Sequence, residues 1–449
     1  MKIFIKNATI VNEGLSFKGS VLIVDDEIKL ILNDSMLLEN IDVDEIIDAT
    51  GLVLIPGVID DHVHFREPGM TNKADINSET IAAAAGGITS FMDMPNSIPA
   101  ATTIENLEKK YATAKEKSLI NYSFYLGATN ENIDEIKKVD AKNVCGIKVF
   151  MGSSTGNILV DNEKSLEKIF EYSPTLVAVH CESEDIINKN LSYYKNKFGD
   201  NIPFEYHSKI RSEEACVVST KCAIELAEKH NVRLHILHIS TAKEIELLAA
   251  CNNNRISSET CTHYLWFCDD DYSAMQEKIK CNPSIKTQAD KVALQKAVSC
   301  GIINIVATDH APHLLDEKNN NYLKCPSGLP SVQHSLNVML ELVRSNVLKI
   351  ETLVDCMCHN PARIFGIEKR GFIREGYKAD IVLINPNTKW MVNKSNILYK
   401  CAWSSLENVE FNAKITHTFV NGKLVYCDGK INKDVRGERL TFSSNNFRI

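Results

Sequence analysis

The stretch LVLIPGVIDDHVHFREPG, residues 52–69, joins a short apolar strand to two closely spaced histidines. Its β-branched start is typical of a strand buried in a parallel sheet. Side chains alternate along a strand with a period of two, so His62 and His64 are expected on one face. Two imidazoles on one face can bind a divalent ion. Two hydrogen-bonded structural histidines are the alternative that this pair alone leaves open.

Seven more apolar runs follow, and segments with helical periodicity such as 78–87 and 213–230 separate them. Strands that alternate with helices in this way predict an α/β fold, a (β/α)8 TIM-like barrel. In such barrels the chemistry lies at the C-terminal ends of the strands. The eight runs span residues 52–64, 88–94, 121–128, 146–152, 176–182, 233–240, 256–264 and 303–310.

Both ends of the chain have β-strand patterns without intervening helices. Residues 2–11 and 20–32 carry β-branched runs, and ADIVLI at 379–384 begins a similar pattern. Short strands next to turn residues such as Asn421-Gly422 predict hairpins. We expect the two ends to pair into a small satellite β domain beside the barrel, with residues 1–52 and 371–449 in the composite, sandwich-like domain and 53–370 in the barrel.

The composition restricts the possible partners. The 449 residues are 44% hydrophobic and 24% charged, which is typical of a globular protein with a large core. The formal net charge of −8 argues against nucleic acid as a partner. No apolar run reaches the ~18–20 residues of a membrane helix, and the N-terminus is too polar for a signal peptide. We expect a cytoplasmic protein that binds neither nucleic acid nor membranes, with its 14 cysteines mostly buried and reduced.

Further metal-competent side chains fall in or at the ends of the predicted strands. His180 and His238 end the fifth and sixth runs, Asp93 lies in the second, and Asp309 ends the eighth. Four converging imidazoles are too many for one closed zinc site, so two metals are the natural interpretation. A carboxylate at Asp309 can bind a metal and accept the proton of an attacking water. His235, an odd number of residues from His238, is expected to face the helix layer as a structural residue.

Lys148 lies inside the apolar run GIKVFMG, residues 146–152. A buried ammonium is costly, so this lysine must be paired, deprotonated or chemically modified. A neutral amine can react with CO₂ to give a carbamate, whose two oxygens could bridge two metals. An ion pair between Lys148 and a glutamate inside the barrel is the alternative.

Motifs along nearly the whole chain carry a family resemblance. They are PGVIDDHVHFREPG (56–69), AAAAGGITSFMDMPN (82–96), GIKVFMG, VHCE, LHILHIS, ETCTHYL, ATDHAPH and GFIREGYKADIVLI (371–384). Together they are similar to the cyclic amidohydrolases, a group that includes dihydroorotases, allantoinases and hydantoinases. The resemblance implies a hydrolase with two zinc ions per chain and Asp309 as its catalytic acid and base. It implies one zinc on His62, His64 and Asp309, the other on His180 and His238, and an N6-carboxylated Lys148 that bridges them.

The residues that are expected to contact the substrate narrow the choice among the cyclic amidohydrolases. A planar guanidinium binds carboxylate bidentately, so Arg66, in HVHFREPG, suits a ring that carries a carboxylate. Its position resembles that in dihydroorotases, which implies reversible hydrolysis of L-dihydroorotate to N-carbamoyl-L-aspartate in pyrimidine biosynthesis. Structural roles are the alternatives: a salt bridge for Arg66, a turn cap for Asn96, a loop role for His313. The resemblance implies further substrate contacts at Asn96, Asn282, His313, Gly328 and Pro330.

Other interpretations stay open at the level of the sequence. An allantoinase or hydantoinase on the same scaffold is the nearest alternative, and a catalytically inactive scaffold protein is the alternative from another class. The polar segment 314–328 is expected to be either a lid over the site or a surface excursion. A homodimer is expected from the resemblance and from the frequency of two-fold assemblies.

Overall fold

The computed structural model describes residues 1–33, 42–152 and 158–443. Within these residues, eight strand positions follow one another in the order of the predicted apolar runs. The strands are β6 (Val58–Val63), β7 (Ile88–Asp93), β8 (Asn121–Phe124) with its continuation β9 (Leu126–Gly127), β10 (Ile147–Phe150), β11 (Val177–His180), β12 (Leu234–Ile236), β13 (Ile256–Cys261) and β14 (Ile305–Ala307).

These strands close into a barrel. Neighbours pair in parallel from β6 to β8 and again from β9 to β14. Tyr125 alone separates β8 from β9, and a parallel bridge between Val63 and His310 joins the end of the ring to its start. The predicted (β/α)8 barrel with an additional β domain is confirmed.

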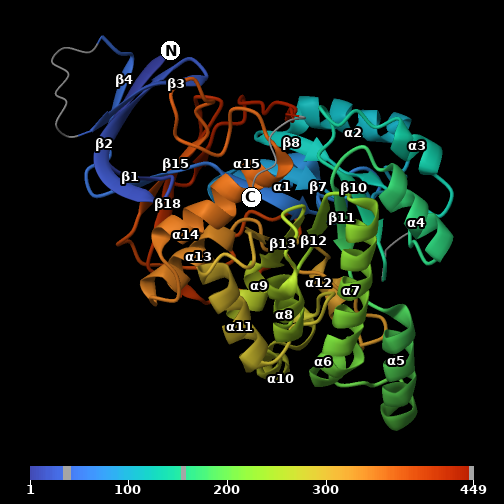
Figure 1. Ribbon diagram of the computed structural model, residues 1–449. Helices are drawn as coiled ribbons and strands as arrows, with labels where there is room; N and C mark the ends of the chain where they lie inside the picture. Colours follow the sequence, from blue (N-terminus) through green and yellow to red (C-terminus); the bar gives the residue numbers. More distant parts are fainter. Residues whose placement is uncertain (34–41, 153–157, 444–449) are drawn as a thin grey trace.

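Helices cover the outside of the barrel, and side-chain caps fix where several of them begin (Figure 1). Asp75, Thr103, Ser212 and Thr241 each accept a hydrogen bond from a backbone N–H in the first turn of the following helix. The helices are α1 (Ile76–Ala85), α2 (Ile104–Lys117), α3 (Ile133–Lys137), α4 (Glu163–Tyr172), α5 (Glu184–Phe198), α6 (His207–Ile210), α7 (Glu213–His230), α8 (Ala242–Ala250), α9 (Thr262–Trp266), α10 (Tyr272–Met275), α11 (Gln288–Ser299), α12 (Leu315–Lys318), α13 (Ser335–Arg344), α14 (Ile350–Val354) and α15 (Asn360–Phe365), with short turns η1 (Phe204–Tyr206), η2 (Asp269–Asp271), η3 (Gln276–Ile279) and η4 (Asp355–His359).

A second sheet unites the two ends of the chain beside the barrel (Figure 1). Its strand order is β20-β19-β18-β15-β5-β1-β2-β3, with β4 paired to β1. The strands are β1 (Lys2–Asn12), β2 (Leu15–Val24), β3 (Glu27–Asn33), β4 (Glu45–Asp48), β5 (Val53–Pro56), β15 (Ile381–Asn385), β18 (Lys414–Val420), β19 (Lys423–Cys427) and β20 (Lys430–Ile431), and a separate ribbon consists of β16 (Trp390–Met391) and β17 (Glu410–Phe411).

The boundaries between the two domains stay a prediction. β5, which falls just inside the residues assigned to the barrel, pairs with β1 and β15 in the second sheet. At the other end, Arg439 bridges Tyr122 of the barrel, and Phe442 packs in the same apolar cluster as Ile59. The described C-terminal residues therefore pack against the barrel.

Alternation along the barrel strands determines which side chains reach the interior. In β11, Val177 and Val179 join the apolar layer between strands and helices, whereas Ala178 joins the cluster inside the barrel. His180 lies two residues after Ala178, so the two side chains point to the same side of the strand. The His180 side chain therefore lies on the interior face, at the C-terminal end of the strand. None of the described helices combines the length and the apolar character needed to cross a membrane.

Candidate active site and metal centre

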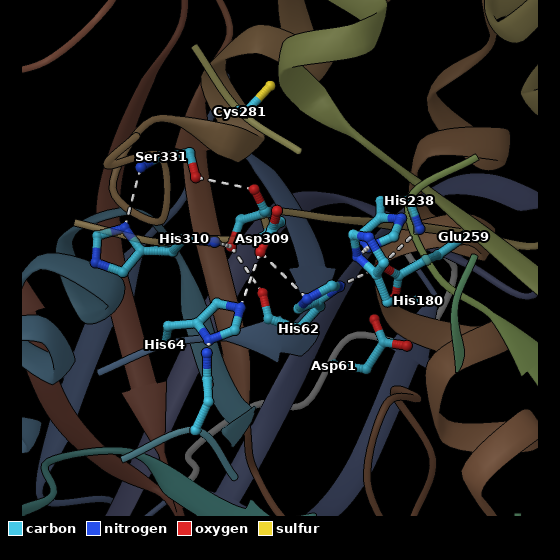
Figure 2. Close-up of polar contacts among 12 residues, drawn as sticks. Asp61, His62, His64, His180, His238, Glu259, Cys281, Asp309, His310 and Ser331 are labelled. Carbon is cyan, nitrogen blue, oxygen red and sulfur yellow. Dashed lines mark hydrogen bonds and ion pairs between the residues drawn. The ribbon is translucent and has the colours of Figure 1, made fainter. Parts of the chain in front are cut away.

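The first group of candidate ligands consists of His62, His64 and Asp309. The Asp309 Oδ1 atom lies 3.2 Å from Nε2 of His62 and 3.0 Å from Nε2 of His64. Ligand atoms of all three residues lie within 4.8 Å of one another, and all three side chains are buried. Figure 2 shows the two rings pointing toward the Asp309 carboxylate. The predicted convergence of these residues is present in the structure.

The second nitrogen of each ring has its own partner, which fixes the direction of the ring. Nδ1 of His62 lies 2.6 Å from Oε1 of Glu259, and Nδ1 of His64 lies 2.7 Å from Oδ1 of Asn96. Since carboxylate and amide oxygens accept hydrogen bonds, each Nδ1 is the donor and each Nε2 faces Asp309. Asn96, predicted as a substrate contact, therefore orients a candidate metal ligand.

His180 and His238 form the second group. Nδ1 of His180 lies 2.8 Å from Nε2 of His238, so both nitrogens face the same point. On its other side, His180 Nε2 donates to Glu182 Oε2 at 2.9 Å, and the Arg211 guanidinium holds the Glu182 carboxylate. Glu259 links the two groups, because its Oε1 also accepts the backbone N–H of His238 at 3.1 Å.

Burial sets the protonation of three rings. It lowers the pKa of His64 to about 4 and lowers those of His180 and His238 below the ordinary value. Burial also lowers the pKa of His62, but the carboxylates of Glu259 and Asp309 outweigh it and raise that pKa to about 10. Metal ligation requires neutral imidazole, so a cation near His62 would replace its proton, while the other rings are already neutral.

Lys148 belongs to the lining of the cavity that both groups share. Its ammonium nitrogen is buried and has no hydrogen-bond partner among the described residues, with only the Phe150 ring 4.5 Å away. Burial lowers its pKa to about 7, despite the nearby carboxylates of Glu259 and Asp309. The alternative of an ion pair with a glutamate is therefore not present in the described part of the chain.

The donor set fits divalent metal. It combines four imidazoles, three of them already neutral, one carboxylate and a buried amine with no hydrogen-bond partner among the described residues, all in the lining of one cavity. Nitrogen and carboxylate ligands of this kind suit zinc and its neighbours, and the carboxylates behind the histidines are typical of metal sites. The residues present would therefore hold metal between His62, His64 and Asp309 and between His180 and His238.

The cavity has a volume of about 190 Å³ and collects nearly all of the predicted site residues. Pro330 is the exception, since it is not part of the lining. Leu329 bridges His310, and the backbone N–H of Ser331 donates to Nδ1 of His310 at 3.0 Å (Figure 2). After Gly328 the chain therefore no longer lines the cavity. The lining comprises His62, His64, Arg66, Asn96, Lys148, Phe150, His180, His238, Asn282, Asp309, Ala311, His313, Pro326, Ser327 and Gly328.

Arg66 brings an uncompensated positive charge to this cavity. Its guanidinium donates to the Pro312 carbonyl at 3.2 Å and lies 3.2 Å from Nε2 of His313. No described carboxylate lies within ion-pair distance of it, so the salt-bridge alternative does not hold for the described residues. Burial lowers the pKa of Arg66 to about 10, which still leaves it a cation at neutral pH. An anionic group of a ligand would therefore find a buried, charged partner here.

The expected direction of the His235 side chain was wrong, although its structural role agrees with its contacts. Its ring lies inside the barrel, with Nε2 3.2 Å from Asp61 and 3.3 Å from Glu259, and Nδ1 2.8 Å from Ser257. The parity argument from His238 fails because β12 ends at Ile236, and His238 itself has a φ of +43°, outside strand geometry. His235 thus helps to hold the Glu259 carboxylate in place.

Asp93 is a structural residue. Its Oδ1 accepts from the backbone N–H of Phe65 at 2.8 Å, and its Oδ2 accepts from Lys110 at 2.6 Å. Lys110 also donates to the Met94 carbonyl at 3.0 Å, and both charged side chains are 2% exposed. The pair fixes the backbone that follows His64.

Replacing Lys110 by methionine is therefore expected to destabilise the fold strongly. The Asp93 carboxylate would stay buried without its counter-charge, which typically costs about 3–5 kcal/mol in the free energy of unfolding. Urea denaturation measures the change. Lys109→Met is the matched control, because the neighbouring Lys109 is 66% exposed and forms a surface ion pair with Glu105. Equal stabilities of the two variants would contradict the prediction.

Three carboxylates that support the site were not among the predicted site residues. Glu259 and Glu182 orient the candidate ligands, as described above. Asp60 accepts the Thr308 hydroxyl at 2.6 Å and so ties β6 to β14 beneath Asp309. The signal was present in part, since Glu259 and Glu182 lie in the quoted motifs ETCTHYL and VHCE. Their partners are 197 and 29 residues away, which no spacing rule predicts.

Comparison with known proteins shows the family of the chain. The model of the amidohydrolase family matches residues 53–425. The dihydroorotase of Methanosarcina acetivorans is 30% identical over 98% of this chain and 95% of its own length. The dihydroorotase of Geobacter metallireducens is 33% identical over 85% of this chain and 89% of its own.

Solved structures show the same fold. An L-hydantoinase (dihydropyrimidinase) from Arthrobacter aurescens superimposes with a TM-score of 0.92 at 24% identity, covering 98% of this chain and 99% of that one. A dihydropyrimidinase from Brevibacillus agri gives 0.90 at 25% identity, covering 99% and 100%. With a family match over most of its length and relatives at 30% identity or more, the chain belongs to the amidohydrolase family.

Proposed function

We propose that the protein is a dihydroorotase, which interconverts L-dihydroorotate and N-carbamoyl-L-aspartate in pyrimidine biosynthesis. The observation that carries this proposal is the buried Arg66 guanidinium, which lines the cavity of the candidate metal ligands without a described carboxylate partner. Dihydroorotate is a cyclic amide with a ring carboxylate, whereas hydantoin and dihydrouracil lack this charge. The two relatives named dihydroorotase support the same choice.

The proposed cofactor is a pair of zinc ions. One would be held by His62, His64 and Asp309 and the other by His180 and His238, with an N6-carboxylated Lys148 as the bridge. The buried amine of Lys148, which has no hydrogen-bond partner in the described part of the chain, supports its modification, since carboxylation converts a costly cation into a metal-binding anion. When bound, the zinc ions would polarise the scissile carbonyl and activate the attacking water.

The protein's own residues divide the remaining work. In the hydrolytic direction, water oxygen bonds to the ring carbonyl carbon, and the ring C–N bond breaks. Asp309 takes a proton from the water and delivers it to the leaving nitrogen, so its carboxylate ends as it began. Arg66 binds the substrate carboxylate, with His313 beside it, while Asn282 and the Gly328 backbone face the ring. Pro330 is not proposed as a contact, because it does not line the cavity.

The test is a substrate panel followed by absorbance. L-dihydroorotate, hydantoin, dihydrouracil and allantoin are compared at equal concentration, with and without added zinc. Preferential turnover of L-dihydroorotate is the expected result. Preference for an uncharged ring would replace the proposal by a hydantoinase or allantoinase. Zinc binding without turnover of any ring would indicate an inactive scaffold protein.

The proposed homodimer rests on the resemblance and is tested by sedimentation velocity.

Replacing Lys148 by alanine is expected to reduce bound zinc to less than half of the wild-type content. The alanine removes the proposed bridge but leaves all four histidines in place. Metal analysis after gel filtration measures zinc per chain, and intact-mass analysis of the wild type detects the added CO₂. Lys137→Ala, on the outer helix α3, is the control. Unchanged zinc content in the Lys148 variant would remove this lysine from the metal site.

A further inference from the structure

Two lysines that have no acidic partner among the described residues lie buried behind one wall of the cavity. Lys318, at the end of α12, is fully buried, and its Nζ donates to the backbone carbonyls of Lys280, Pro326 and Gly328 at 3.1, 3.0 and 3.0 Å. An ammonium has three N–H donors, so Lys318 uses its full capacity on main-chain oxygens. It joins two segments that are far apart in the sequence.

Lys280 makes the reciprocal connection. Its Nζ donates to the carbonyls of Tyr322 and Cys325 at 2.7 and 2.6 Å, while its own carbonyl accepts the Gly328 N–H at 2.9 Å. Among the described residues, neither Lys280 nor Lys318 forms an ion pair. Burial lowers the pKa of each lysine to about 8, and the groups that face the two charges are backbone carbonyls together with the Tyr322 ring, 4.4 Å from Nζ of Lys280.

Tyr322 anchors the same segment from the opposite side. Its hydroxyl lies 2.8 Å from Nδ1 of His207 in α6, and His207 Nε2 lies 2.8 Å from the Cys281 carbonyl. The segment 314–328 therefore contacts the barrel through backbone and side-chain hydrogen bonds along much of its length. Neither a free surface excursion nor a loosely held lid has such anchors.

The carbonyls that the lysines hold belong to the segments that line the cavity. Pro326, Ser327 and Gly328 form one part of the lining and Asn282, two residues after Lys280, forms another. Gly328 has a φ of +133°, and a Cβ there would lie 2.5 Å from the Ala311 carbonyl, so its backbone sits directly at the wall. A shift of the Lys318 contacts would move this wall relative to Arg66.

We propose that Lys318 and Lys280 are positioning residues, which clamp segments 280–282 and 326–328 into a fixed wall that fits the substrate ring. The inference rests on the proposed function of the cavity and deepens it. The clamp holds main-chain hydrogen-bonding groups in place before the substrate binds. Substrate binding therefore does not lose affinity to the ordering of these groups. Segment 314–328 is thus a permanent part of the binding site.

Lys318→Met tests the clamp, because methionine keeps the length of the side chain and removes its donors. The expected result is a loss of about 10²-fold in kcat/KM for L-dihydroorotate, mainly through KM, as misplacement of a positioning element produces. Zinc content should stay at the wild-type value, since no candidate ligand is touched. Lys324→Met is the matched control: Lys324 lies exposed in the same segment, and its variant should match the wild type.

Limited trypsin digestion gives a readout independent of turnover. Cleavage after Lys324 should be slow in the wild type with and without L-dihydroorotate, and faster in Lys318→Met. Fast wild-type cleavage that substrate suppresses would overturn the fixed wall in favour of a lid. If Lys318→Met does not fold, Lys280→Met serves as the second variant with the same expected results.

The outcomes separate the clamp from the proposed function. If the wild type turns over an uncharged ring instead of L-dihydroorotate, the proposed function fails, and the KM comparison is repeated with that ring. An unchanged KM in both lysine variants, for whichever ring is turned over, would overturn the clamp. If no ring is turned over, equal trypsin cleavage of wild type and variants would overturn it.

Discussion

Asp309→Asn is expected to lower kcat for hydrolysis of L-dihydroorotate by about 10³–10⁴-fold, the upper range for loss of a positioned acid–base group. The carboxylate lies 3.2 and 3.0 Å from His62 and His64, and their rings hold its pKa well below the ordinary value, against the effect of burial. The amide of asparagine cannot accept the proton of the attacking water. Stopped-time assays at saturating substrate measure the loss.

The choice of asparagine keeps the backbone in place. Asp309 has a φ of +44°, a left-handed conformation that asparagine adopts more readily than most residues. Asp316→Asn is the control, because Asp316 lies exposed on α12 seven positions along the chain. Zinc content of the Asp309 variant is measured in parallel. Retention of more than a tenth of the wild-type kcat would exclude Asp309 as the group that moves the proton.

The sequence predicts the barrel because its evidence is local and repeated. Each strand is a short apolar run, and several helices between strands begin at a side-chain cap of their own, so errors at one position do not affect the next. Local alternation along one strand also predicts that His62 and His64 act as a pair. The predicted barrel in turn gives the end of each strand as the location of the chemistry, where His180 and Asp309 are found.

What the sequence does not predict is non-local or depends on irregular backbone. Arg66, His238 and Asp309 all have positive φ, at 64°, 43° and 44°, so strand parity says nothing about where their side chains point. Such conformations typically cost about 1–3 kcal/mol each and persist where the surrounding structure enforces them. The wrong expectation for the direction of the His235 side chain follows from this irregularity. The contacts of Glu259 and Lys318 join segments that only the folded chain brings together.

The scaffold itself does not decide the substrate. The superimposed hydantoinase structures share the fold at about a quarter identity, whereas the curated relatives compared here are named dihydroorotases. One barrel can host several ring hydrolases, because the strands fix the metal ligands and the loops line the rest of the cavity. The choice of substrate therefore depends on single loop residues. Among them, Arg66 carries a positive charge that only rings with a carboxylate can pair with.

Arg66→Met is expected to lower kcat/KM for L-dihydroorotate by about 10²–10³-fold and to leave turnover of hydantoin or dihydrouracil within a few fold of wild type. Removing one partner of a buried, hydrogen-bonded charge pair typically costs 2–5 kcal/mol, and only the charged ring forms that pair. The loss should appear mainly in KM, because the carboxylate lies away from the bond that breaks. Steady-state kinetics on the four rings measure the ratio.

Arg66→Lys separates charge from geometry. Lysine keeps the positive charge but lacks the planar fork that binds both carboxylate oxygens, so an intermediate loss is expected. A lysine variant equal to wild type would mean that a point charge is enough and that the fork plays no part. Equal losses for charged and uncharged rings in Arg66→Met would instead assign Arg66 to holding the Pro312–His313 backbone, and the preference for dihydroorotate would then need another residue.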